Sequence, residues 1–230
     1  MTVILETRSL NKEFGAVIAA KDLDVRISKG EIVGVIGSNG AGKTTLFKTL
    51  TGEVLPEQGT ITTWGREVTN LSAAARVGLG FGRTFQVASL APEFSALRNV
   101  MLAVQARQGT SFHFFKPVMR DTSLTDPARE ALARVGLSDR ADVPAAELSH
   151  GERRQLEIAI ALALDPKVLL LDEPAAGVNP ALLDLICDRI VEINRSGVSI
   201  LLIEHNMEMV ARLCGRVVVM AGGRRLMEGS

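Results

Sequence analysis

A glycine-rich octapeptide between two apolar segments constrains this chain more than any other feature. It reads, in order, Gly37, Ser38, Asn39, Gly40, Ala41, Gly42, Lys43 and Thr44. The nearly continuous apolar run Ile32 to Ile36 before it indicates a strand buried on both faces, and Thr45 to Leu50 after it indicates an apolar helix. A buried strand, a glycine-rich turn and a helix in this order predict an α/β fold built around a phosphate-binding loop.

The residue types of this loop explain how it would hold a phosphate. Small residues let consecutive backbone N–H groups turn inward around phosphate oxygens, and the following helix adds the positive end of its dipole. We predict that residues 37 to 45, Thr45 included, bind a nucleotide. Lys43 would reach the β- and γ-phosphates and assist catalysis, and the Thr44 hydroxyl would ligate Mg²⁺. The alternative, a glycine-rich turn that binds nothing, is disfavoured by the flanking strand and helix.

Further apolar runs extend the predicted core sheet. Val168 to Leu171 and Ser199 to Ile203 resemble the run before the loop and predict additional buried strands. Helices are expected between them, one capped at Asp126 with Pro127 in its first position and another opened by the Asn-Pro pair at 179–180. Buried strands that alternate with helices predict a mostly parallel sheet.

The two ends of the chain carry antiparallel signals. Residues 22 to 27 alternate strictly between polar and apolar, which predicts a half-buried strand in an N-terminal antiparallel β region. Residues 217–220 and 224–227 flank Ala221-Gly222-Gly223 and predict a closing hairpin. About residues 87–160 lack a buried-strand signal, so we expect an inserted helical subdomain there. The whole chain, 1–230, is then a single domain whose catalytic core comprises 1–86 and 161–230.

Composition limits the class of protein. Lysine plus arginine and aspartate plus glutamate balance at 26 each, which gives no whole-protein field for nucleic acid. The longest apolar stretch, Ile158 to Leu164, is far shorter than the roughly 20 residues that span a bilayer. Cys187 and Cys214 lack metal-ligand spacing and are expected to be free thiols in a reducing compartment. The first ten residues lack a basic leader, a long apolar run and a small-residue cleavage pattern, so a secretion signal is not expected there.

Two acids follow the predicted strand at 168–171. A carboxylate at the C-terminal edge of a sheet, beside a phosphate loop, is where Mg²⁺ is held, and Asp172 fits that position directly or through a water. Glu173 points differently and can polarise an attacking water as general base. The alternative is a pair of solvated acids that open a loop, with Pro174 ending the strand.

A capping box precedes this strand. Ser149 and Glu152 have the spacing of a capping box at the start of an amphipathic helix. Taken alone, this pair indicates a structural role only. The segment 148–152, however, has Gly151 placed 21 residues before Asp172, and it closely resembles the signature loop of ATP-binding cassette (ABC) ATPases. That resemblance implies that Ser149 and Gly151 bind the γ-phosphate of ATP held by an opposite subunit, which is compatible with a capped helix N-terminus acting as an anion site.

Other elements of the same family occur in order along nearly the whole chain. Phe14 resembles the aromatic residue that stacks on adenine, and Gln86 resembles the Q-loop glutamine that contacts Mg²⁺ and the attacking water. Residues 176–179, ending at Asn179, resemble the D-loop, which also contributes to nucleotide binding. His205 resembles the switch histidine that would contact the γ-phosphate and hold the water together with Glu173.

Within the family, the chain is most similar to the ATPases of branched-chain amino acid importers, the LivG-like group. Four segments carry the match: 83–86, 154–159, 173–180 and 203–205. The stretch 111–119 also coincides with an insertion of that group. His150 and Glu152 depart from the commoner glycine and glutamine of the signature loop, and Asn179 from the commoner aspartate. We expect Glu152 to bond back to its own helix and not to face a phosphate.

The resemblance implies a complete working assembly. Its cofactors are ATP and Mg²⁺, and its partners are two multispanning permease subunits, a sister ATPase and, indirectly, a periplasmic or extracellular solute-binding protein. A heterodimer with the sister ATPase is favoured over a homodimer. The chain would be peripheral on the cytoplasmic face of the cell membrane, held there by the permease. Three phenylalanines, Phe112, Phe114 and Phe115, either contact that permease or pack internally.

Two alternatives remain open from the sequence. Importers of urea, amides or other small organic solutes share much of the pattern, and the segment 148–151 leans slightly towards them. A soluble ABC ATPase of an assembly complex would use the same motifs without transport. Relatives of this group usually continue beyond the end at Ser230, so a short C-terminal tail is expected to follow.

Overall fold

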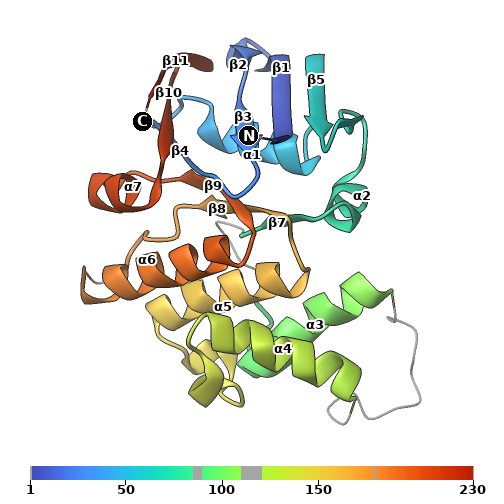
Figure 1. Cartoon of the computed structure of the whole chain (residues 1–230), viewed down its shortest axis with the longest axis vertical. Helices are drawn as coiled ribbons and strands as arrows, with labels where there is room; N and C mark the ends of the chain where they lie inside the picture. The colour runs from blue at the N-terminus through green and yellow to red at the C-terminus, as the bar shows by residue number, and fades with distance from the viewer. Residues whose placement is uncertain (1, 85–89, 110–120, 179, 230) are drawn as a thin grey trace.

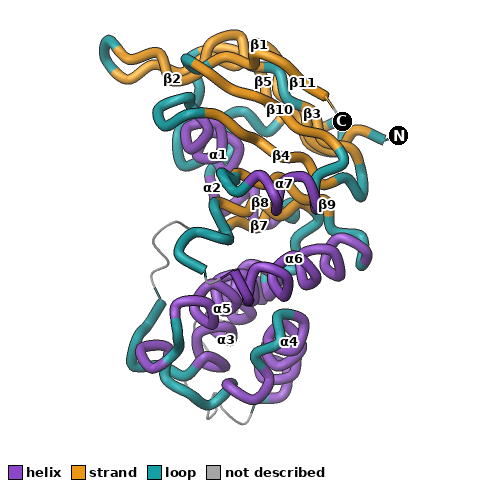
Figure 2. The backbone as a smooth tube through the Cα atoms, turned by 90° about the vertical axis from the view of Figure 1, so that its left-hand side faces the viewer, coloured by secondary structure: helices purple, strands orange, loops and turns teal. Residues whose placement is uncertain are grey.

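A computed structural model describes residues 2–84, 90–109, 121–178 and 180–229. Figure 1 shows the antiparallel strands at the top, a mostly parallel sheet below them and a layer of helices at the bottom. The view turned by 90° shows the same order, with both chain ends among the strands (Figure 2). The α/β fold with a parallel core sheet, an antiparallel β region and an inserted helical part is confirmed.

The central sheet carries the predicted buried strands. Its strands are, in spatial order, β11 (Arg224–Gly229), β10 (Arg216–Ala221), β4 (Ile32–Gly37), β9 (Ser199–Ile203), β8 (Val168–Asp172) and β7 (Phe81–Arg83). All neighbours pair in parallel except β10 and β11, which form the predicted hairpin. Every residue of β8 and β9 is buried because alternate side chains enter two different cores. Leu169 and Leu171 face the helical layer, whereas Val168 and Leu170 face the antiparallel sheet.

The antiparallel sheet is built on one long strand. That strand, β1 (Val3–Phe14), pairs with β2 (Val17–Leu23), β3 (Arg26–Ser28) and β5 (Gln58–Thr63), and β5 pairs with the short β6 (Arg66–Glu67). The single strand predicted at 22–27 is wrong, since β2 ends at Leu23 and β3 begins three residues later, at Arg26. Asp22 has a φ of +47°, and the Asp24 carboxylate accepts a 2.6 Å hydrogen bond from the Ser9 amide. This turn moves the chain from one stretch of β1 to another.

Four helices lie next to the central sheet in the described part of the chain. They are α1 (Lys43–Thr51), α2 (Ala73–Gly78), α6 (Pro180–Arg195) and α7 (Met207–Leu213). The buried Arg76 of α2 bonds to the last turn of α1. Its guanidinium donates to the carbonyls of Thr49 at 2.6 Å and Leu50 at 2.7 Å, and also to the carbonyl of Thr69 at 2.7 Å. The helix behind the phosphate loop is thereby held at its C-terminal end.

The remaining helices form the bottom layer. They are α3 (Ala96–Gln108), α4 (Thr122–Arg134), two short 3₁₀ turns, η2 (Ser138–Arg140) and η3 (Ala145–Glu147), and α5 (His150–Ala163). The helices α3, α4 and α5 pack on one another through one apolar cluster, as Figure 2 shows at its lower end. The boundaries of a subdomain at residues 87 and 160 stay a prediction.

The predicted start of α4 is wrong by several residues. The helix begins at Thr122 with Asp121 as its cap, and Pro127 lies inside it. A proline there removes the N–H that would bond to the Ser123 carbonyl. That carbonyl instead accepts a 2.9 Å hydrogen bond from the side-chain amide of Gln108 on α3. A contact from a neighbouring helix therefore compensates for the proline.

Among the described residues, no helix combines the length and the apolar character needed to cross a membrane. Cys187 and Cys214 are free thiols, as predicted.

Candidate nucleotide-binding and hydrolysis site

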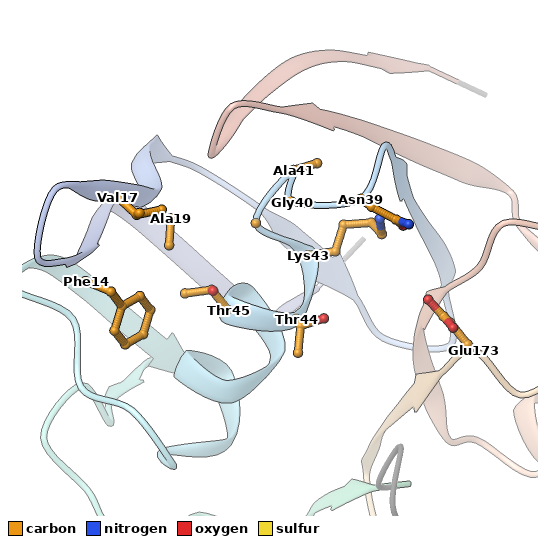
Figure 3. Close-up of a pocket in the computed structure, with 11 residues that line it drawn as sticks. Phe14, Val17, Ala19, Asn39, Gly40, Ala41, Lys43, Thr44, Thr45 and Glu173 are labelled. Atoms are coloured by element: carbon orange, nitrogen blue, oxygen red, sulfur yellow. The ribbon is translucent and has the colours of Figure 1, made fainter.

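A pocket of about 410 Å³ runs along the glycine-rich loop. Its lining residues come from the first hairpin, from the loop and the start of α1, and from the turn after β8: Phe14, Val17, Ala19, Asn39, Gly40, Ala41, Gly42, Lys43, Thr44, Thr45 and Glu173. Figure 3 shows Phe14 and Val17 at one end, Glu173 at the other, and the loop between them. The structure thus joins three separate sequence predictions in one pocket.

Two glycines of the loop occupy positions where the Cβ atom of any other residue would collide with the backbone. Gly42 has a φ of +99°, and a Cβ atom there would lie 2.2 Å from the Ala19 carbonyl oxygen. A Cβ on Gly37 would lie 2.2 Å from the carbonyl oxygen of Met220. The loop is therefore wedged between β2 and the end of β10, and a side chain at either position would push it out of place. A closely packed cradle without Cβ atoms fits a phosphate chain held by backbone N–H groups.

Lys43 is folded over this loop. Its Nζ donates to the carbonyl oxygens of Gly37 at 2.8 Å and Ser38 at 3.0 Å, and the residue is buried. Burial lowers the pKa of the Lys43 ammonium, and the carboxylates of Glu173 and Asp172 oppose that shift. The ammonium is thus held at the mouth of the loop, between backbone oxygens and the two acids, where it can bind phosphate oxygens.

The hairpin end of the pocket is apolar and open. Phe14 is 49% exposed and Val17 is 64% exposed, although both are large apolar side chains. The Lys12 ammonium lies 5.1 Å from the centre of the Phe14 ring. An exposed aromatic ring beside a phosphate loop suits stacking on a planar base. Val17 and Ala19 were missed by sequence reasoning, because they line the pocket through strand pairing and carry no local motif.

Asp172 lies at the buried end of β8. Its carboxylate is fully buried and accepts a 3.2 Å bond from a guanidinium nitrogen of Arg83 on β7. Burial raises the pKa of Asp172, and the Arg83 charge opposes that shift. Arg83 also pairs with Glu53, just beyond the end of α1. The sequence marked Arg83 as part of a motif but assigned it no contact with Asp172, since the two residues are distant in the chain.

Glu173 and His205 are brought together by neighbouring strands. The Nε2 atom of His205 lies 2.9 Å from a carboxylate oxygen of Glu173, and both side chains are partly exposed, at 44% and 29%. Glu173 adopts a φ of +50°, and its amide donates at 2.9 Å to the carbonyl of Ile203 at the end of β9. An acid and an imidazole in contact beside the pocket can share and move a proton.

The capping box at the start of α5 is confirmed in both directions. The Ser149 hydroxyl accepts from the Glu152 amide at 3.3 Å, and the Glu152 carboxylate accepts from the Ser149 amide at 2.8 Å. Arg140 donates to the other carboxylate oxygen at 2.7 Å, and these contacts lower the pKa of Glu152 to about 2. The carboxylate is thus directed at its own helix and at Arg140, as expected from the sequence.

The signature-like loop contacts the segment that resembles a D-loop. A Cβ atom on Gly177 would lie 3.0 Å from the imidazole of His150, and one on Gly151 would lie 2.8 Å from the side chain of Leu182. Neither Ser149 nor Gly151 lines the pocket formed by the described residues. Their contribution to a phosphate site, as implied by the resemblance, concerns a second subunit.

Some predicted residues fall outside the described part of the chain. Gln86, Asn179 and the three phenylalanines Phe112, Phe114 and Phe115 all lie there. Sequence reasoning also gave no function to Glu204, a buried acid next to His205.

A family model and curated relatives that resemble this chain all belong to ATP-binding transport proteins. Residues 20–176 match the family described as ABC transporter. The high-affinity branched-chain amino acid transport ATP-binding protein LivG of Salmonella typhimurium is 36% identical over 99% of this chain and 91% of its own length. The Nod factor export ATP-binding protein I of Cupriavidus pinatubonensis is also 36% identical, over 100% of this chain and 67% of its own length.

A solved structure extends the comparison to the fold. The ADP conformation of an ATP-binding cassette of an ABC transporter superposes with a TM-score of 0.88 and 30% identity. The match covers 100% of this chain and 91% of the other.

Proposed function

Since this chain belongs to the ABC transporter family, we propose that it is the ATP-hydrolysing subunit of a membrane importer for branched-chain or related amino acids. The observation that carries the hydrolytic part is the 2.9 Å contact between Glu173 and His205 beside the phosphate loop. Glycine-rich loops that bind phosphate are common to many proteins, whereas this pair supplies what hydrolysis needs in addition.

Different residues of the pocket bind the base and the phosphates of ATP. Phe14 stacks on the base, and the backbone N–H groups of residues 37–45 hold the phosphates. Lys43 exchanges its bonds to the loop carbonyls for the β- and γ-phosphate oxygens.

Two oxygen donors fit a magnesium ion, one that lines the pocket and one at the end of β8, next to Glu173 but outside the pocket lining. Thr44 and Asp172 offer a hydroxyl and a carboxylate, the hard oxygen ligands that Mg²⁺ prefers, and Gln86 would add a third oxygen. When bound, Mg²⁺ neutralises charge on the phosphates and stabilises the transition state. Asp172 already has its charge stabilised by Arg83, so it acts on the ion directly or through a water.

Hydrolysis uses the two neighbouring side chains. Glu173 accepts the proton of the attacking water as general base. His205 holds that water in place through Glu173 and contacts the γ-phosphate. Gln86 would contact the same water and the magnesium ion.

We propose that two ATPase subunits enclose ATP between them. In such a sandwich Ser149, Gly151 and Asn179 of one subunit complete the site of the other. The capped N-terminus of α5 supports this, since Ser149 is exposed there and the charge of Glu152 is paired with Arg140. The partner is a sister ATPase in a heterodimer by preference, with a homodimer as the alternative.

Transport requires partners in the membrane. Two multispanning permeases would hold the pair at the cytoplasmic face, and a solute-binding protein would deliver the solute. The similarity to LivG over nearly its whole length supports an importer of branched-chain amino acids. The exporter relative is matched over a smaller share of its length and so gives weaker support to export. Import of urea or amides, and a soluble assembly ATPase, are the competing functions.

One experiment addresses activity and partners together. The Glu173→Gln variant, tagged and expressed in its native cells, should retain ATP binding but lose nearly all hydrolysis, and so trap the ATP-bound assembly. Affinity purification with ATP should then yield two multispanning permeases and a second ATPase, and the associated binding protein can be screened for its solute. Normal hydrolysis by the variant would exclude Glu173 as the base. Recovery of soluble assembly proteins without a permease would overturn the transport proposal.

A further inference from the structure

A buried carboxylate lies directly behind the Glu173–His205 pair. Glu204 follows the end of β9 and is 3% exposed. Two thiols, the buried Cys187 and the partly buried Cys214, have a pKa raised by burial, and the charge of Glu204 adds to that shift, which for Cys214 reaches about 12. An acid in such surroundings is costly unless its oxygens are bonded, so its contacts define what it does.

Its two oxygens bond to two different loops. One oxygen accepts a 2.8 Å hydrogen bond from the amide of Ala175, in the loop after β8. The other accepts from the amides of His205 at 2.9 Å and Asn206 at 3.1 Å, in the loop after β9. One carboxylate therefore joins the loop that carries Glu173 to the loop that carries His205. Hydrogen bonds to an ionised acceptor are roughly twice as strong as neutral ones, which makes this a firm connection.

The connection matters because the Glu173 turn is not a relaxed one. A glutamate at a φ of +50° occupies the left-handed region, which is unfavourable for a residue with a Cβ atom and persists only where the surroundings hold it. Two bonds to the β9 side hold this turn: the Glu173 amide donates to the Ile203 carbonyl, and the Ala175 amide donates to Glu204.

We propose that Glu204 is a positioning residue for hydrolysis, which fixes the distance and orientation between Glu173 and His205. This inference rests on the proposed function of that pair. Glu204 does not line the pocket of the described residues, and it acts through the two loops that its carboxylate joins.

Two variants separate the bonds. Glu204→Gln keeps the shape but removes the charge and turns one acceptor into a donor that faces an N–H group. Glu204→Asp keeps the charge and shortens the side chain by one methylene, so it retains the bonds to His205 and Asn206 and loses the one to Ala175. Glu208→Gln is the matched control, since Glu208 is an exposed glutamate four residues further along.

The experiment measures steady-state ATPase kinetics, nucleotide binding and amide hydrogen exchange by NMR on the full chain. In both Glu204 variants kcat should fall about 10- to 100-fold, while each chain still binds one nucleotide with wild-type affinity. Exchange at Ala175 should accelerate in the aspartate variant. In the glutamine variant, exchange should accelerate either at Ala175 or at His205 and Asn206, whichever amides face the new side-chain NH2 group. The control should match the wild type in all three measurements. If Glu204→Gln does not fold, kcat and amide exchange of the aspartate variant alone test the proposal.

Unchanged kcat in a folded Glu204 variant, or unchanged exchange at Ala175 in the aspartate variant, would overturn the proposal. Loss of nucleotide binding in parallel with kcat would do the same, because it indicates general damage to the fold. A wild-type chain without ATPase activity when assayed together with its sister ATPase and permeases would refute the proposed function instead. In that case, the Ala175 exchange rate alone would still decide whether Glu204 joins the two loops.

Discussion

Replacing Glu152 with glutamine tests whether this acid serves its own helix or faces a nucleotide. Glutamine retains the shape and can still accept from the Ser149 amide, so the change removes mainly the charge beside Arg140 and the helix start. The pKa of about 2 shows that the folded state favours the ionised form. The full pKa shift would overstate the contribution of this charge to the free energy of unfolding, because the side chain is 23% exposed and solvent screens its charge. We expect a loss of about 1 kcal/mol in the free energy of unfolding at pH 7.

The pH dependence has a definite sign. The pKa of Glu152 is lower in the folded than in the unfolded chain, so its contribution is fully present above the ordinary value of 4.5 and is lost as the pH falls towards 2. Urea unfolding of the two proteins should therefore differ by a constant amount from pH 8 to about pH 5.5 and converge below about pH 4.5. High salt should reduce the difference, since part of it is an exposed ion pair.

The same variant should hydrolyse ATP normally. The carboxylate bonds away from any phosphate, so kcat and the KM for ATP should stay within about twofold of the wild type. Glu147→Gln, which changes a neighbouring exposed acid, is the matched control. A KM for ATP at least fivefold lower in Glu152→Gln, and unchanged in the control, would refute the reasoning, because it would mean that the wild-type carboxylate repels the nucleotide.

Three further changes test the loop and its support. Lys43→Ala should weaken ATP binding at least about tenfold, because it removes the cation at the phosphate end; equal affinity in a fluorescent-nucleotide titration would count against the loop assignment. Gly42→Ala should lower the unfolding free energy by about 2 kcal/mol or more, whereas Gly40→Ala, also at positive φ but with no atom near its Cβ, should lose only about 1 kcal/mol. Urea unfolding compares the two, and equal losses would exclude the contact with Ala19 as the cause. Arg76→Met should lower stability by about 3–5 kcal/mol, since the carbonyls of Leu50 and Thr69 lose their buried side-chain donor, while the exposed Arg129→Met should stay within about 0.5 kcal/mol.

The sequence predicts those parts of the molecule whose cause is local. Buried strands such as β8 and β9 follow from continuous apolar runs, and the start of α5 follows from Ser149 and Glu152, three residues apart. The glycine-rich loop is likewise contained in one segment. In each case the residues that determine the structure are neighbours in the chain.

The failures arise where the determining partner is distant. Pro127 suggested a helix start, but Gln108 of another helix makes its position inside α4 acceptable. Asp24 interrupts the predicted strand, because its carboxylate accepts from the Ser9 amide, 15 residues earlier. Arg83 and Asp172 are 89 residues apart, so no spacing rule brings them together. Tertiary contacts of this kind override local patterns without leaving a local signal.

The bonds of Lys43 to the loop have a consequence for the kinetics of nucleotide binding. The Lys43 ammonium, bonded to the carbonyls of Gly37 and Ser38, supports the curved shape of the loop from within the chain. Association then needs an exchange of hydrogen-bond partners at one side chain, without a folding step and its loss of conformational entropy. A preorganised loop of this kind lets on-rates approach the ordinary range for docking, and differences in affinity among variants of the pocket then reside mainly in how fast the nucleotide leaves.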